Sequence, residues 1–163
     1  AAKSPLSLVE QVEKVNLERK IAMAARVEAA ANGSVRGKRV AVLGVTFKPN
    51  TDDMREAPSL VILPILQSRG ATISACDPQG RVNAAAILPG VEWFDDPLEV
   101  AEHADVLLVL TEWNEFRALD LKKLRQVMKG DVLVDLRNVY QAHTAENAGF
   151  RYFGLGRAGQ VTP

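Results

Sequence analysis

Two hydrophobic patterns follow one another along the chain. In the first stretch apolar residues recur at helical spacing, as at Leu8 and Val12, and charged residues lie between them. Ser4 and Pro5 suit the start of a helix, and Gly33 suits the position just beyond its end. We therefore expect a long N-terminal helix whose apolar side packs either on its own domain or across a domain or dimer interface.

After a polar connection the pattern changes to short β-branched runs that alternate with helical stretches. The runs expected to form buried strands are 39–45, 71–77, 105–110 and 131–136. The stretches expected to form helices are 58–69, 97–103 and 113–128. This alternation predicts an α/β fold, a Rossmann-like and mostly parallel sheet with helices on both faces, preceded by the long helix.

Composition narrows the function classes. The length of 163 residues, with 47% hydrophobic and 25% charged residues, fits one globular domain with an added element. Twenty basic residues balance twenty acidic ones, so no overall charge favours a nucleic acid or a membrane surface. The single cysteine, the absence of a His/Cys cluster and the lack of a signal or membrane-spanning stretch lead us to expect a cytoplasmic protein without a metal site.

The predicted sheet places the candidate site. Ligands of parallel α/β sheets bind at the carboxyl ends of the strands. Segments 44–55, 111–116 and 137–140 follow three of the predicted strands and should share that edge, with Asp77 nearby. The first turn holds only Gly44 where a dinucleotide-binding turn has GxGxxG, so the standard NAD fingerprint is absent.

The charges of the first segment have two interpretations. Lys48 and Arg55 lie close to the start of a predicted helix, where cations and free backbone amides favour a phosphate. Alternatively, both are solvated charges paired with Asp52, Asp53 or Glu56. Spacing alone favours the second interpretation, because charge-rich loops are common.

Arg137 also has two interpretations. It directly follows a predicted buried strand, so its guanidinium would reach the ligand edge and could bind a phosphate through two donors. Alternatively, it forms a salt bridge to Asp135 or to an acid of a neighbouring loop. The residues alone leave both open.

Four other residues of these segments are expected to be structural. Cys76 lies within a predicted strand, so we expect its thiol to be buried and unreactive. Asp77 precedes Pro78, which favours a turn. Trp113 and Phe116, three residues apart, are more typical of a core than of a base-stacking pair.

The run GVTFKPNTDDMREAPSL, residues 44–60, resembles a motif of the UDP-glucose/GDP-mannose dehydrogenase family. The resemblance extends to VEQVEKVNLERK upstream and to ACDPQG, TEWNEF, VDLRNVY and GFRYFGLGR downstream, so it covers essentially the whole chain. Within the family, the Phe-Lys-Pro-Asn-Thr-Asp-Asp form looks most like that of the enzymes acting on UDP-glucose.

The resemblance implies a domain organisation and a function. Residues 1–36 would be the end of the central domain, whose long helix joins the two halves and contributes to a homodimer, and 37–163 the C-terminal UDP-sugar-binding domain. The family oxidises the primary alcohol of the sugar to a carboxylate with NAD, so the implied parent is a UDP-glucose 6-dehydrogenase that forms UDP-glucuronate. Alternatives are a dehydrogenase for GDP-mannose or a UDP-N-acetylhexosamine, and a non-enzymatic nucleotide-binding or oligomerisation module.

The resemblance also implies roles for single residues. Phe47, Lys48 and Arg137 match positions that contact the nucleotide sugar, and Arg55 matches one that reaches NAD on the other domain. The family's catalytic cysteine and its N-terminal NAD-binding domain are not matched here, and Cys76 does not correspond to that cysteine. We expect no catalytic residue in this chain, an N-terminal NAD-binding domain as its partner, and no dehydrogenase activity from the chain alone.

Overall fold

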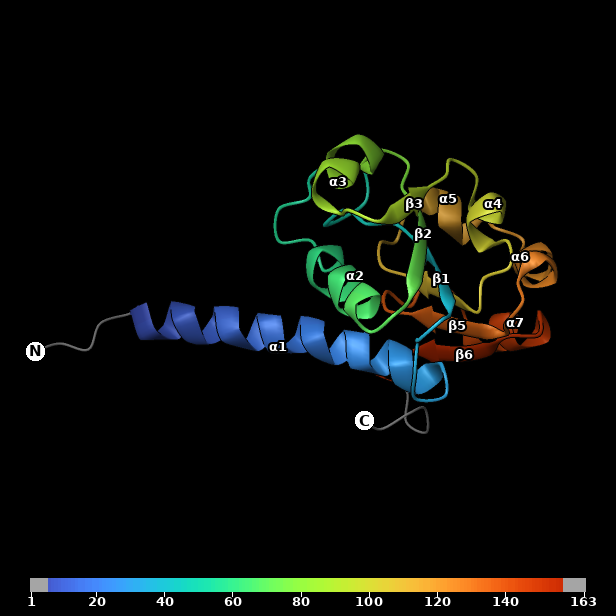
Figure 1. Ribbon diagram of the computed structural model, residues 1–163, viewed down its shortest axis with the longest axis horizontal. Helices are drawn as coiled ribbons and strands as arrows, with labels where there is room; N and C mark the ends of the chain where they lie inside the picture. Colours follow the sequence, from blue (N-terminus) through green and yellow to red (C-terminus); the bar gives the residue numbers. More distant parts are fainter. Residues whose placement is uncertain (1–5, 157–163) are drawn as a thin grey trace, which may run out of the picture.

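A single parallel sheet organises the chain (Figure 1). The computed structural model describes residues 6–156. The strands are β1 (Arg39–Leu43), β2 (Thr72–Cys76), β3 (Val91–Trp93), β4 (Val106–Val109), β5 (Val132–Asp135) and β6 (Arg151–Gly154). They are paired in the order β3-β2-β1-β4-β5-β6, and every neighbouring pair is parallel. This is the strand order of a Rossmann fold, so the predicted fold class is confirmed.

Helices cover both faces of the sheet (Figure 1). They are α1 (Leu6–Ala30), α2 (Ser59–Ser68), α3 (Arg81–Ile87), α4 (Pro97–Ala101), α5 (Asn114–Arg117), α6 (Leu121–Val127) and α7 (Ala142–Asn147). Side chains of a strand alternate between faces, so Val42 joins the core under α1, α2 and α3, whereas Leu43 joins the core under α4 to α7. The central strands are therefore apolar at nearly every position.

The long helix α1 has two different halves. Its C-terminal half packs on α2 and β5, with Ala24 and Val27 fully buried. Its N-terminal half extends past the domain body, and Val12 is exposed (Figure 1). Gly33, at φ +87°, donates its N–H to Glu28 O and ends the helix as predicted. The predicted starting residues Ser4 and Pro5 lie outside the described residues.

One prediction from the sequence pattern was wrong in detail, and four short elements were missed. The expected helix 113–128 is divided into α5 and α6, because the Asp120 carboxylate accepts hydrogen bonds from Lys122 N and Lys123 N and so starts a new helix. The short edge strands β3 and β6 and the helices α3 and α7 were not predicted, since strands of three or four residues and helices of six or seven carry little periodic signal. Between residues 6 and 156, no helix has the length and apolar character needed to span a bilayer.

Candidate functional site

A buried carboxylate joins three loops at the carboxyl ends of the strands. Asp77, just after β2, accepts hydrogen bonds from Val45 N at 2.7 Å, Thr46 N at 3.1 Å and Gly80 N at 2.7 Å. The indole N–H of Trp113 also donates to it at 3.3 Å. The predicted turn role of Asp77 is therefore confirmed, and the same side chain also holds the loop after β1 and the loop after β4.

This packing fills the place where a Rossmann fold binds a dinucleotide. Gly44 has φ +80°, and a Cβ at this position would lie 2.5 Å from Thr111 Cβ. Thr111 Oγ1 in turn donates to Thr46 O at 2.7 Å. Trp113 and Phe116 are buried in the core, as predicted. The first turn thus has Gly44 but not the other glycines of the fingerprint, it has no space for a pyrophosphate, and the carboxylate that could bind a ribose is occupied, so this turn does not fit NAD.

The open part of the ligand edge of the sheet is a cleft between α1 and the loops that follow β1 and β5. The cleft has a volume of about 540 Å³, within the range of small-molecule sites. Phe47, from the loop after β1, and Arg137, from the loop after β5, both line it. Helix α1 supplies a further wall, made of Asn16, Arg19, Lys20 and Met23. Two residues predicted from separate loops are therefore brought together, and α1 adds two cations that the sequence analysis did not identify.

The partner of Arg137 lies on the neighbouring loop. Nε and Nη2 of Arg137 donate to the two carboxylate oxygens of Glu112, in a bidentate ion pair. This hydrogen bond holds the pKa of the Glu112 carboxyl below its usual range, so the pair stays charged. Of the two acids considered from the sequence, the loop acid is therefore the partner. Arg137 therefore both pairs with Glu112 and lines the cleft, so its two interpretations do not exclude each other.

Asp135 has a different role from the one considered for it. This carboxylate is fully buried at the end of β5 and accepts from Arg137 N at 3.1 Å and Tyr140 N at 2.9 Å. The hydroxyl of Tyr152 donates to it at 3.1 Å. Asp135 therefore fixes the backbone that carries Arg137 rather than pairing with its guanidinium.

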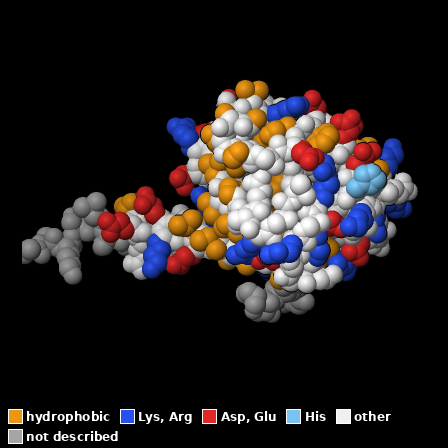
Figure 2. All heavy atoms as spheres, in the orientation of Figure 1, with side chains coloured by type: hydrophobic (Ala, Val, Ile, Leu, Met, Phe, Trp, Pro, Cys, Tyr) orange, Lys and Arg blue, Asp and Glu red, His pale blue; other side chains and the backbone are white. Residues whose placement is uncertain are grey.

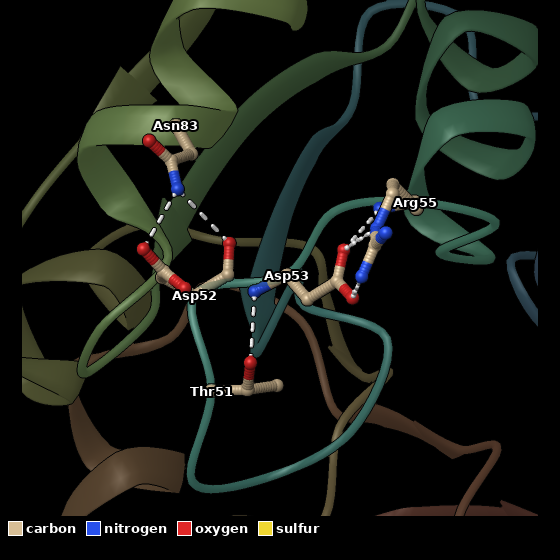
Figure 3. A network of polar contacts seen from close by, with 5 residues as sticks. All are labelled: Thr51, Asp52, Asp53, Arg55 and Asn83. Carbon is tan, nitrogen blue, oxygen red and sulfur yellow. Dashed lines mark hydrogen bonds and ion pairs between the residues drawn. The ribbon is translucent and has the colours of Figure 1, made fainter.

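Lys48 and Arg55 do not line the cleft as Phe47 and Arg137 do. The Lys48 side chain is exposed directly after Phe47 and forms no hydrogen bond or ion pair with any residue of the described range. Arg55 borders a separate hollow that includes Asp53 and Asn83. Figure 3 shows the contact of Arg55 with Asp53 and that of Asn83 with Asp52. Its side chain is 89% exposed and pairs with Asp53 at 2.7 Å, as the second interpretation of its charge predicts.

The Asp53–Arg55 pair gives a measurable titration. Hydrogen bonds from the Arg55 side chain and backbone lower the pKa of Asp53 to about 2. We expect an NMR pH titration of the Asp53 carboxyl carbon to show this midpoint, and we expect Arg55→Ala to move it back toward the ordinary aspartate range. Because the folded pKa is depressed, the contribution of the pair to stability is present above the ordinary pKa and is lost as pH falls toward 2. An unchanged midpoint in Arg55→Ala would contradict this ion pair.

No group for redox or nucleophilic chemistry stands out among the described residues. Burial raises the pKa of the Cys76 thiol to about 12, so it stays protonated at neutral pH, as expected of a structural cysteine. Residues 6–156 contain no group of three or more metal-ligating side chains placed to hold an ion.

Known proteins with solved structures have the same fold. A UDP-D-ManNAc dehydrogenase from Pyrococcus horikoshii is 27% identical, with a TM-score of 0.75 over 98% of this chain and 36% of its own. A UDP-glucose dehydrogenase from Pyrobaculum islandicum is 29% identical, with a TM-score of 0.67 over 90% of this chain and 31% of its own. Both are nucleotide-sugar dehydrogenases by name.

Curated relatives with the same kind of name are similar to this chain at higher sequence identity. A UDP-glucose 6-dehydrogenase of Rhizobium meliloti is 49% identical over 94% of this chain, and the enzyme TuaD of Bacillus subtilis is 37% identical over 94%. The chain spans about a third of the length of these relatives, 35% and 33%. Residues 41–142 match the model of the UDP binding domain of the UDP-glucose/GDP-mannose dehydrogenase family. This chain therefore belongs to the UDP-glucose/GDP-mannose dehydrogenase family.

Proposed function

We propose that the cleft between α1 and the loops binds a UDP-sugar, and that the chain is the nucleotide-sugar-binding part of a UDP-glucose 6-dehydrogenase. The observation that carries the proposal is the meeting of Phe47 and Arg137 in one cleft of about 540 Å³ together with cations of α1. The relatives at 49% and 37% identity, both UDP-glucose 6-dehydrogenases by name, favour UDP-glucose over other nucleotide sugars.

The cleft has the chemistry that a nucleoside diphosphate requires. Glu112 engages Nε and Nη2 of Arg137, so Nη1 remains to donate to a phosphate oxygen. Phe47 is 48% exposed, and its ring offers an apolar face to the nucleotide or the sugar. Lys48 follows Phe47 and, in this proposal, adds a cation at the mouth of the cleft.

NAD has its main binding site outside the described residues in this proposal. The loop after β1 does not fit a pyrophosphate, and Arg55 is the one cation assigned to the cofactor, across the exposed hollow beside Asp53. When bound, NAD would accept one hydride in each of two successive oxidations that convert the primary alcohol of UDP-glucose to the carboxylate of UDP-glucuronate, so that two NAD are reduced and water supplies the second carboxylate oxygen. The residues of this chain would bind and orient the substrate.

The proposal includes an organisation for the whole protein. Residues 1–36 would end the central dimerisation region, and 37–163 would form the UDP-sugar-binding domain. The projecting half of α1, with Val12 exposed, is consistent with an N-terminal NAD-binding domain and a second subunit as partners. The buried, reduced Cys76 is consistent with a cytoplasmic protein.

Thermal and chemical unfolding with added ligands tests the proposal. We expect UDP at about 100 times its Kd to raise the free energy of unfolding by about 2.7 kcal/mol, because it binds only the folded state. NAD at the same concentration should leave unfolding unchanged, and the chain mixed with UDP-glucose and NAD should form no NADH. Stabilisation by NAD alone, or reproducible NADH formation, would contradict the proposal.

A further inference from the structure

An ion pair connects α1 to the loop that precedes α2. Lys20 Nζ lies 3.0 Å from Glu56 Oε2. The two side chains differ in exposure, since that of Lys20 is 18% exposed and that of Glu56 is 86% exposed. The lysine is therefore held by its surroundings, whereas the glutamate reaches it from solvent.

This pair lies on the boundary between two hollows. Lys20 and Glu56 line the cleft that contains Phe47 and Arg137. Both also line a second hollow between α1 and α2, beside Leu17 and Leu60. Figure 2 shows apolar side chains gathered where α1 meets the domain body. Glu56 has φ +59°, a left-handed conformation that is uncommon for a glutamate. The loop thus holds the carboxylate beside Lys20 at the wall of the cleft.

We propose that Lys20 is a phosphate-binding residue of the cleft, and that Glu56 occupies its ammonium group until a nucleoside diphosphate displaces it. The inference rests on the proposed function, because it concerns the same cleft. The ammonium group is paired in both states, so exchanging a carboxylate for a phosphate avoids an unpaired charge in an enclosed position. Glu56, when released, is already near water, where a carboxylate is well solvated.

The charges around the cleft favour this exchange. Three cations line it, Arg19, Lys20 and Arg137, and the acids that face them are Glu56 and Glu112. Glu112 is bound bidentately to Arg137, whereas Glu56 contacts Lys20 through one oxygen. Of the two acids, Glu56 has the weaker hold and the greater exposure, so it is the one that an incoming phosphate replaces.

A double-mutant cycle with UDP and uridine tests the inference. Lys20→Met keeps the apolar stem and should weaken UDP binding about tenfold, the size of one charge-assisted hydrogen bond. Glu56→Gln should tighten UDP binding roughly threefold, because it removes a competitor that is largely solvated. In the Lys20→Met background the gain from Glu56→Gln should disappear. Uridine has no phosphate, so its affinity should be the same in all four proteins.

Matched controls lie on the same helix. Lys14→Met removes a cation that pairs with Glu18 away from the cleft, and Glu13→Gln removes an acid that borders only the second hollow. Neither should change UDP affinity by more than about twofold. Unfolding midpoints of all variants show whether α1 stays packed.

Three outcomes separate the possibilities. UDP binding that depends on Arg137 but is unchanged in Lys20→Met overturns this inference alone. Equal weakening of UDP and uridine in Lys20→Met also overturns it, because the lysine would then only support the wall. Absence of UDP binding by the unaltered chain overturns the proposed function and, with it, this inference.

Discussion

Asp77→Ala is expected to lower the free energy of unfolding by about 3 to 4 kcal/mol, because at least two buried N–H groups lose their partner at about 1 to 3 kcal/mol each. The groups affected are Val45 N, Thr46 N, Gly80 N and the Trp113 indole. All lie in a buried region with little access for water. The loss would also free the loop that carries Phe47, so the substitution should disturb the cleft as well as the fold.

Urea unfolding at neutral pH measures this effect. Asp131→Ala is the control, since that carboxylate forms an exposed ion pair with Arg151 at 3.0 Å and should contribute less than about 1 kcal/mol. Asp77→Asn keeps an acceptor, so its loss in the free energy of unfolding should lie between those of Asp77→Ala and Asp131→Ala. If Asp77→Ala is no more destabilising than Asp131→Ala, the carboxylate does not hold the three loops together.

Arg137→Ala is expected to weaken UDP binding at least tenfold, since a hydrogen bond to a charged group contributes about 1.5 to 3 kcal/mol. Calorimetric titration of UDP at low salt measures the change. Arg117→Ala is the matched control, because Arg117 is an exposed arginine in a different hollow, near α6 and α7. Arg137→Lys should recover part of the affinity, because an ammonium group supplies the charge without the planar fork.

Two results would count against this role of Arg137. Equal loss of UDP affinity in Arg117→Ala would show a general effect of charge rather than a contact in the cleft. Unchanged affinity in Arg137→Ala would leave the guanidinium with a purely structural role, as the partner of Glu112. Unfolding of each variant must be measured in parallel, because Glu112 loses its partner in Arg137→Ala.

The sheet and its ligand edge could be predicted because strong local patterns specify them. Continuous apolar runs such as those of β4 and β5 are buried on both faces and leave little ambiguity. Parallel strands then place segments 44–55 and 137–140 on one edge, and the resemblance singled out Phe47 within the first of them; both Phe47 and Arg137 line the cleft. Their contact with a nucleotide sugar stays a prediction.

The contribution of α1 could not be predicted in the same way. The strand-edge rule concerns the loops after strands, and it does not say along which side a preceding helix passes. Arg19 and Lys20 were not identified from the sequence, because nothing local indicates that α1 packs on α2 beside the cleft. Helix packing of this kind depends on residues far apart in the sequence.

Asp77 and the 113–128 region show the limits of local patterns at single residues. The Asp-Pro sequence predicts a turn, but its bonds to Val45 and Trp113 join residues 32 and 36 positions away. Conversely, the helical pattern after Trp113 is continuous enough to hide the break at Asp120. There two hydrogen bonds from backbone N–H groups to the Asp120 carboxylate outweigh the periodicity.

Amide NMR spectra recorded during a UDP titration test most directly the claim that the cleft between α1 and the loops binds the nucleotide. We expect the largest shifts at Phe47, Lys48 and Arg137, and at Lys20 on α1, while the amides of α7 on the opposite face stay unchanged. Saturating shifts confined to another surface, or no shifts at millimolar UDP, would contradict it.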